Sequence, residues 1–174
     1  MKSKIIPTKT ETVLKPDAFL VSKTDTKGKI TYANRNFLDI AGYAEVELFG
    51  QQHNIVRHPD MPRGIFALLW ETLKNGSEFN AYVKNLRKDG GFYWVFANIS
   101  PNLSARGNTE GYYSVRRKPS SEAIKSISTL YQTMLAAEQK VGTKRAITAS
   151  TAVLNTWLKQ TTGETEYATY ILSL

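Results

Sequence analysis

A run of ten residues holds both histidines of the chain together with an arginine and an aspartate. It reads His53-Asn54-Ile55-Val56-Arg57-His58-Pro59-Asp60-Met61-Pro62. Each proline steers the residue before it away from the helical region, so we expect a shaped polar loop, with Pro62 suited to the first position of a following helix. Imidazole, guanidinium and carboxylate groups at a helix entrance are typical of a ligand or anion site. A proline-rich turn with solvated charges is the alternative, and composition alone favours that alternative.

The two histidines also raise the question of a metal or catalytic centre. A transition-metal site needs further ligands, which the sequence does not offer. The chain has no cysteine, which excludes disulfides, thiolate nucleophiles, Cys-ligated zinc and iron–sulfur clusters. It also excludes the light chemistry that joins a flavin to a cysteine. We therefore expect neither a metal site nor a set of catalytic residues.

The elements that position this loop follow from the periodicity of apolar residues. Residues 17–25 and 29–33 predict two strands of a first hairpin, with a turn between them. Asn34 predicts the N-cap of a short helix that ends at Gly42, and residues 44–49 predict another helical turn or two. The opening loop comes next along the chain.

A helix and three strands follow the loop. Residues 62–73 place Ile65, Phe66, Leu69, Trp70 and Leu73 on one helical stripe. Residues 79–86, 92–100 and 111–117 predict strands, and the turn Lys88-Asp89-Gly90-Gly91 predicts a hairpin between the first two. The order β-β-α-α-α-β-β-β indicates an α+β fold, with a five-stranded antiparallel sheet and short helices on one face.

The chain divides by character into three parts. Residues 1–16 predict an N-terminal cap, 17–120 the main folded domain and 121–174 a C-terminal helical segment. These last helices are amphipathic, so each must bury a face on the sheet, on another helix or on a partner. On the outer face of the sheet, Trp94 and Phe96 need a cover, and we expect an interface covered in part by the chain's own flanks.

Charge and hydropathy limit the partners. The net charge is +8, but the basic residues are scattered, so we expect no nucleic-acid binding and rather a solvated surface or an acidic partner. No apolar stretch approaches the roughly 20 residues that span a membrane, so we expect no direct membrane insertion. The first residues lack the apolar region of a signal peptide, which makes the cytoplasm the expected location.

The element order and these turns resemble a PAS domain. Four segments narrow the resemblance: the loop 53–62, Leu69-Trp70 in the helix, the run 83–90 and the strand segment 93–95. Together they resemble the FAD-binding PAS domain of bacterial aerotaxis receptors over about residues 17–120. Those receptors continue into membrane and signalling segments, so the chain looks more like stand-alone PAS proteins that work beside a separate membrane-bound energy-taxis receptor.

The resemblance implies a function. It implies a redox or oxygen sensor module, not an enzyme, that binds FAD noncovalently and signals its oxidation state to a chemotaxis-type receptor in trans. Recruitment to the inner membrane face by that receptor is implied as well, and a homodimer through the flanking helices is a further expectation. The alternatives are a haem- or small-ligand-binding PAS module, although the helix 62–74 has no histidine, and a flavin-dependent enzyme, which lacks an evident acid/base set.

Eight residues become candidates for contact with FAD. Strand alternation places Asn85 in an apolar row, where its amide suits the hydrogen-bonding edge of a flavin; bonding to the backbone is the alternative. Arg57 and His58 suit the pyrophosphate or ribose. Phe66 and Trp70 suit packing against the flavin ring, although Trp70 could instead belong to the core. Asp60 could contact the cofactor, hold Arg57 or cap the next helix, and Asn34 could contact the cofactor or be only an N-cap. The last candidate is Ser114, whose hydroxyl could relay redox change to the sheet.

Overall fold

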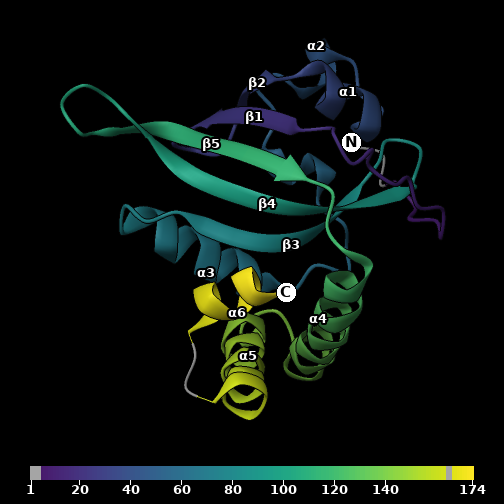
Figure 1. Ribbon diagram of the computed structural model, residues 1–174, viewed down its shortest axis with the longest axis vertical. Helices are drawn as coiled ribbons and strands as arrows, with labels where there is room; N and C mark the ends of the chain where they lie inside the picture. The colour runs from purple at the N-terminus through teal and green to yellow at the C-terminus, as the bar shows by residue number, and fades with distance from the viewer. Residues whose placement is uncertain (1–4, 164–165) are drawn as a thin grey trace.

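Five strands form one antiparallel sheet in the order β2-β1-β5-β4-β3 (Figure 1). The computed structural model describes residues 5–163 and 166–174. The strands are β1 (Leu20–Asp25), β2 (Ile30–Ala33), β3 (Phe79–Leu86), β4 (Phe92–Leu103) and β5 (Thr109–Arg117).

The helices fall into two groups along the chain. Four short elements separate β2 from β3, and three helices follow β5. They are α1 (Arg35–Ala41), α2 (Glu45–Leu48), the 3₁₀ helix η1 (His53–Val56), α3 (Arg63–Lys74), α4 (Ser121–Val141), α5 (Ala146–Thr162) and α6 (Tyr167–Ser173). The predicted fold class is therefore confirmed. Among the described residues, no helix combines the length and hydropathy that crossing a membrane requires.

Local chemistry explains where the first helix begins and ends. The Asn34 side chain accepts a hydrogen bond from the Phe37 N–H at 3.1 Å, as an N-cap should. Gly42 ends the helix with a φ of 75°, a left-handed conformation that glycine adopts without the steric cost of a Cβ. Both signals were readable in the sequence.

The N-terminal segment lies along the hairpin between β3 and β4. The Thr8 N–H donates to the Gly90 carbonyl at 2.7 Å, and the Phe92 N–H donates to the Thr10 carbonyl at 2.9 Å. Gly90 has a φ of 89°, and a Cβ there would lie 2.5 Å from the Ile6 carbonyl oxygen. Farther along, Leu14 is buried in the core beneath the sheet. The segment is thus packed against the domain.

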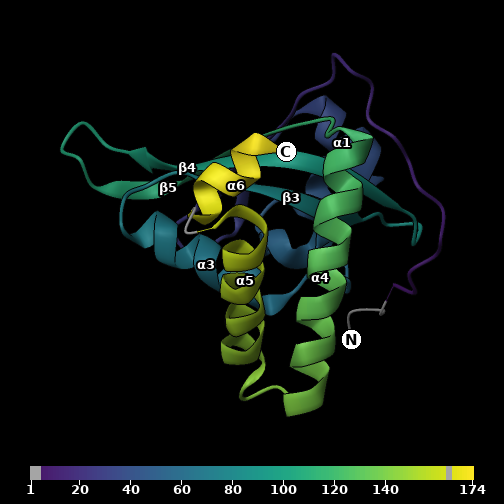
Figure 2. The same cartoon turned by 60° about the horizontal axis from the view of Figure 1, so that its bottom comes forward.

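The sheet is packed on both faces. Its inner face buries Phe37, Leu48 and Val56 from the helical elements between β2 and β3. On the other side, α4 and α6 contact β3, while α5 packs on α3 and α4 (Figure 2). Tyr131 of α4 stacks on Trp94 with ring centroids 6.4 Å apart. The chain's own C-terminal helices therefore cover part of the aromatic outer face, as expected.

A few boundaries differ from the sequence prediction. The strand predicted for 92–100 continues to Leu103, and the strand predicted from 111 begins at Thr109, because these two strands pair with each other beyond the apolar residues. The opening loop contains the 3₁₀ helix η1, which is too short to produce a periodic pattern. Pro62 is the N-cap of α3 instead of its first residue. The apolar tail forms α6.

Candidate functional site

A cavity of about 230 Å³ lies between helix α3 and the inner face of the sheet. Helix α3 contributes Phe66, Leu69 and Trp70 to its wall, and the sheet contributes Val83 and Ile99. These side chains reach one space because α3 presents residues three and four apart on one face, and alternate strand residues share a face. The wall is therefore largely apolar and suits a flat apolar group.

Polar side chains gather at one end of this pocket. Ser22 of β1 pairs in register with Ser114 of β5, and Arg116 takes the next inward position along β5. The Arg116 Nη2 donates hydrogen bonds to the Ser22 hydroxyl and, over 2.8 Å, to the His53 Nε2. His53 Nε2 also lies 3.1 Å from the Ser22 hydroxyl. Asn85, which is 4% exposed, lines the same pocket from β3.

The charges of this polar end follow from its burial. Burial lowers the pKa of Arg116 to about 10, which still leaves the guanidinium charged at neutral pH. Burial and the neighbouring Arg116 lower the pKa of His53 to about 3. His53 is therefore neutral, and its Nε2 lone pair can accept from Arg116. Within the described residues, Arg116 has no carboxylate partner, and its Nη1 and the Ser114 hydroxyl are buried without a hydrogen-bond partner.

Arg57 connects the loop to the pocket wall. Its Nη2 donates to the Met61 carbonyl at 2.8 Å, and its guanidinium carbon lies 4.1 Å from the centroid of the Phe66 ring. Burial lowers the pKa of Arg57, an effect that Glu138 opposes and Arg63 reinforces. A cation that is fixed by a carbonyl and an aromatic ring is pre-organised to meet an anionic group.

Two aromatic residues stand close together in the pocket wall. Trp70 is 37% exposed and packs edge-on against Tyr112 of β5, with ring centroids 5.3 Å apart. Gly28, in the turn between β1 and β2, completes this region. A Cβ on Gly28 would lie 3.3 Å from the Gln52 Oε1 and 3.5 Å from the Trp70 ring. Helix α3, strand β5 and the turn between β1 and β2 therefore meet around Trp70.

This arrangement of sheet, helix and pocket has counterparts among known proteins. The family model described as the PAS fold matches residues 30–116. This chain belongs to the PAS family. The aerotaxis receptor of Escherichia coli (strain K12) is 40% identical over 158 residues, which are 91% of this chain and 30% of the receptor. The nitrogen fixation regulatory protein of Klebsiella pneumoniae is 31% identical over 106 residues, which are 61% of this chain and 21% of that protein.

Solved structures share the fold. A light-oxygen-voltage domain from a study of a flavin analogue superimposes with a TM-score of 0.56 at 25% identity, covering 66% of this chain and 86% of that one. The dark structure of the blue-light photoreceptor Aureochrome1 LOV gives a TM-score of 0.56 at 22% identity, covering 64% and 81%. This PAS chain spans less than a third of the length of either curated relative. The two curated relatives are named as a receptor and a regulatory protein.

The PAS pocket brings together five of the eight predicted contact residues and leaves out three. Arg57, Phe66, Trp70, Asn85 and Ser114 all line it. The other three, namely Asn34, His58 and Asp60, lie elsewhere and contact the chain itself.

The contacts of these three residues are specific. Asn34 caps α1, and its amide donates to the Phe19 carbonyl at 2.9 Å. His58 is buried, and its Nδ1 accepts from the Asp60 N–H at 3.1 Å; burial and Lys84 lower the pKa of His58. Asp60 pairs with the Lys84 ammonium at 2.6 Å. In this structure, His58 and Asp60 therefore shape the loop.

Sequence reasoning missed Arg116 and gave too little weight to His53. The scattered basic residues predict a solvated surface, yet Arg116, which is one of them, is buried. Strand alternation from Ser114 would have placed it inside, because residues i and i+2 share a face. His53 lacked a visible partner in the sequence, since Ser22 and Arg116 reach it only through the folded sheet. Among the described residues, no group of three His, Cys, Asp or Glu side chains is arranged to hold a metal ion.

Proposed function

We propose that this PAS module is a redox or oxygen sensor that holds FAD noncovalently in the pocket beneath α3. The module reports the oxidation state of FAD to a membrane-bound chemotaxis-type receptor, which recruits it to the inner face of the membrane. Two likenesses support this proposal: the similarity to an aerotaxis receptor and the superposition on a light-oxygen-voltage domain studied with a flavin analogue. The pocket itself supplies the physical argument.

One observation carries the proposal. The apolar pocket contains two buried hydrogen-bonding groups without a partner in the described residues, the Arg116 Nη1 and the Ser114 hydroxyl. Buried polar atoms without partners are rare in folded proteins, because each costs the free energy of its lost hydration. A flat apolar ring with one hydrogen-bonding edge would fill the apolar pocket and supply a partner for these two groups. The isoalloxazine of a flavin has this form.

Each lining residue then has a role. Phe66 and Trp70 would pack on the ring, while Asn85 and Ser114 would meet its polar edge. Arg57 would bind the phosphate groups. A bound flavin would supply reversible uptake of electrons. Arg116 would favour that uptake, since a fixed positive charge in a low-dielectric site stabilises added negative charge.

Ser114 is the proposed link from the pocket to the sheet. It lies on β5 between Tyr113 and Val115, whose side chains alternate to the opposite face. A change in its hydrogen bond on reduction would alter β5, and the receptor must then bind the two states with different affinity. We expect Ser114→Ala to retain colour but lose the redox dependence of signalling. Unchanged signalling would argue against this link.

Absorption spectroscopy of the purified protein tests the cofactor. We expect a yellow protein whose flavin bands bleach on anaerobic reduction and return with air, and whose denatured supernatant contains FAD as opposed to FMN. A colourless protein that takes up no added FAD would contradict the proposal. A Soret band would instead identify haem, and steady oxidation of reduced nicotinamide with a substrate would identify an enzyme.

A pull-down from membranes tests the partner. Oxidised and reduced protein should bind a membrane-embedded chemotaxis-type receptor with different affinity, measured at equal protein concentration. Equal affinity of the oxidised and reduced protein for the receptor would contradict the proposed redox signalling.

A further inference from the structure

Helix α3, which forms one wall of the pocket, is capped from a distant part of the chain. The Oε1 of Glu138, in α4, accepts hydrogen bonds from the N–H groups of Arg63 at 2.7 Å and Gly64 at 3.3 Å. These pairs are 75 and 74 residues apart in the sequence. The residue at the N-cap of α3 is Pro62, whose side chain makes no capping hydrogen bond. Glu138 therefore supplies the side-chain cap that α3 lacks locally.

The cap lies within a close contact of three helices. A Cβ added at Gly64 would lie 2.7 Å from the Ser150 hydroxyl of α5 and 3.3 Å from the Met134 Cε of α4. Glu138 is 7% exposed, Met134 is 0% exposed and Ser150 is 0% exposed. The first turn of α3 thus rests on α4 and α5 without free space, so a shift of α3 must displace them.

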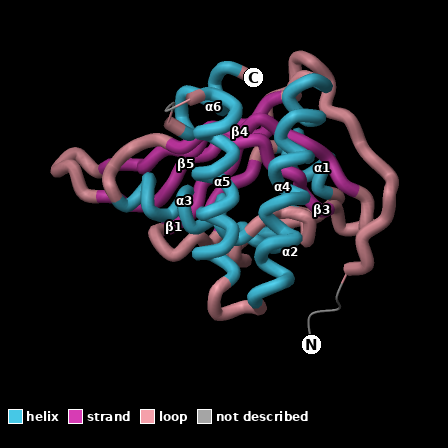
Figure 3. Tube along the Cα trace, turned by 90° about the horizontal axis from the view of Figure 1, so that it is seen from below, coloured by secondary structure: helices cyan, strands magenta, loops and turns pink. Residues whose placement is uncertain are grey.

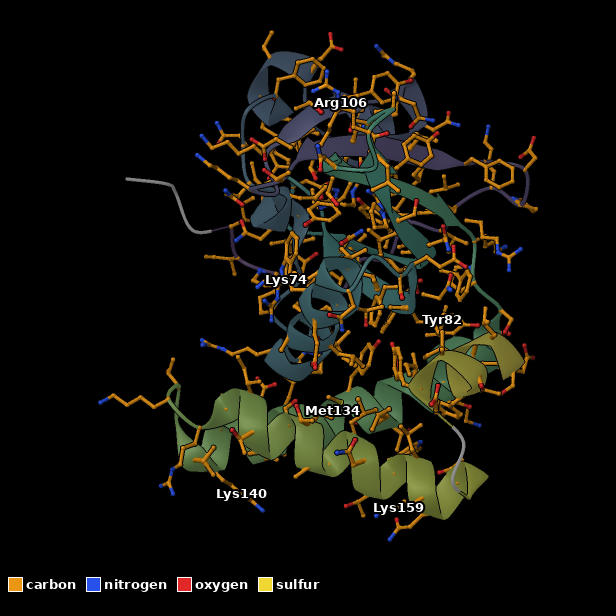
Figure 4. All side chains as sticks on the ribbon, turned by 90° about the vertical axis from the view of Figure 1, so that its left-hand side faces the viewer. Lys74, Tyr82, Arg106, Met134, Lys140 and Lys159 are labelled. Atoms are coloured by element: carbon orange, nitrogen blue, oxygen red, sulfur yellow. The ribbon has the colours of Figure 1, made fainter. Side chains whose placement is uncertain are left out.

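The figures show which side of the helical hairpin α4–α5 faces the domain. Seen from below, α5 and α4 run side by side, and α3 lies next to α5 (Figure 3). In the side-chain view, Met134 lies between the hairpin and the domain, whereas Lys140 and Lys159 point away from it (Figure 4). The hairpin therefore has one face on α3 and another face exposed.

The pocket and the cap act on the same helix. Phe66, Leu69 and Trp70 face the pocket within two turns of the capped residues. Glu138 also acts on the pocket cation Arg57, because its negative charge opposes the effect of burial on the Arg57 pKa. A carboxylate from α4 thus contacts the start of the helix that the pocket's occupant would touch.

We propose that Glu138 is a positioning residue that couples the pocket to the C-terminal helices. When the occupant of the pocket moves α3, the cap and the close contact at Gly64 transmit that movement to the α4–α5 hairpin, whose exposed face becomes a second output beside the sheet. The proposal depends on the proposed function only for the identity of the occupant. The two sites are coupled if occupancy of one changes the free energy of the other.

Hydrogen exchange with and without FAD tests the coupling. In the full chain, FAD should change exchange both in α3 and in the α4–α5 hairpin. Glu138→Met keeps the side-chain volume but removes the acceptor oxygen, and Glu138→Ala is a second variant should the first not fold. In either, we expect the Arg63 and Gly64 amides to exchange roughly ten-fold faster, and the hairpin response to FAD to be lost while FAD still binds.

Two matched variants separate coupling from general damage. Glu138→Gln keeps an amide oxygen that can accept from α3, and it should retain most of the hairpin response. Glu122→Gln changes an exposed carboxylate in the first turn of the same helix and should behave like the wild type. A full hairpin response to FAD in Glu138→Met or Glu138→Ala would overturn the proposal.

A ligand-free arm distinguishes failure of the coupling from failure of the proposed function. Phe66→Ala removes a pocket-facing ring of α3 and should alter exchange in the hairpin in the absence of any cofactor. That effect should disappear in the Phe66→Ala/Glu138→Met double variant. If the protein binds no flavin but this non-additivity is seen, the coupling stands and the proposed cofactor is wrong. If the two substitutions are additive, the coupling is wrong whatever the protein binds.

Discussion

Arg116 is the residue at which stability and function are most clearly opposed. A charged guanidinium at 3% exposure, with a serine and a neutral histidine as its hydrogen-bond partners, is costly to fold. The ring of Phe37, 4.6 Å from the guanidinium carbon, offsets part of that cost. An apolar residue of similar size would serve the core better, so the charge is best explained by what the pocket holds.

Replacing this charge should therefore change the redox properties of the protein. We expect Arg116→Gln to weaken FAD binding about ten-fold or more, and to lower the midpoint potential by roughly 30–60 mV, because reduced flavin loses a stabilising cation. Spectroelectrochemistry of the reconstituted protein measures the potential. Arg106→Gln, in the exposed loop between β4 and β5, is the matched control and should match the wild type. Equal potentials for all three proteins would contradict this role for Arg116.

His53 should make the folded state sensitive to acid. Its pKa is lowered from 6.5 to about 3 by burial and by Arg116, so the unfolded chain binds a proton that the folded chain does not. The contribution of His53 is fully present above pH 6.5. It decreases as the pH falls from 6.5 towards 3, by up to about 1.4 kcal/mol per pH unit.

Urea unfolding between pH 7.5 and pH 4.5 checks this slope. The free energy of unfolding of His53→Gln should fall less steeply with pH than that of the wild type, while NMR of the wild type should show no titration of His53 above pH 4. Parallel stability curves, or an NMR midpoint near 6.5, would show that His53 is not buried as described.

The candidate site was predictable at the residue scale only where one element carries the signal. Phe66 and Trp70 follow from helical spacing, and Asn85 follows from strand alternation. The grouping of His53 with Arg116 depends on the register of β1 with β5 and on the placement of η1, and neither is encoded in a local pattern. The same limit explains why the sequence predicts a cofactor contact at His58 and not at His53, although His53 is the histidine that lines the pocket.

At the scale of elements, Asn34 is the clearest case of two competing roles. Its side chain caps α1, accepts from the Val21 N–H at 3.0 Å and donates to the Phe19 carbonyl at 2.9 Å. These bonds join β1 to α1 and use both the oxygen and the nitrogen of the amide. The contacts favour a structural role, although the sequence suggested cofactor contact as well.

Substitution of Asn34 separates these roles. Asn34→Ala should reduce the free energy of unfolding by about 1–2 kcal/mol, because it removes the cap and the bonds to Val21 and Phe19. FAD affinity, measured under conditions where the variant is fully folded, should be unchanged. Asn36→Ala, which removes one exposed bond to Phe19, should cost less. A loss of FAD binding without a loss of stability would restore Asn34 as a contact residue.

Elements bounded by clear turn or cap residues were predicted well, and elements without such residues were not. Strand β3 matches its prediction at both ends, because Asn75-Gly76 precedes it and Asp89-Gly90 follows it. Helix α4 begins directly after a serine suited to the N-cap position, and the Ser120 hydroxyl accepts a hydrogen bond from the Ala123 N–H. By contrast, the short η1 has no cap signal, and its structure depends on the loop around it.

At the scale of the whole molecule, amphipathicity alone could not place the C-terminal helices. It required a buried face but allowed the sheet, a second helix or a partner as its cover. The structure uses the first two. Tyr131 and Met134 of α4 belong to the same core cluster as Tyr82 and Phe96 of the sheet. The division at residue 120, proposed from composition, therefore cuts through a continuous hydrophobic core.

Shortening the chain tests whether residues 17–120 form an independent domain. A protein ending at residue 120 would expose Tyr82, Trp94 and Phe96, so we expect it to lose several kcal/mol of stability, to bind the dye ANS and to self-associate. Tyr131→Phe in the full chain is the graded control: it removes the hydroxyl that donates to the Tyr82 carbonyl at 2.8 Å, keeps the ring in the core, and should cost about 1 kcal/mol. Urea unfolding and gel filtration measure both variants. If the shortened protein unfolded at the wild-type midpoint and remained monomeric, the C-terminal helices would be an appendage instead of part of the core, and a role for them in output would require a partner to hold them in place.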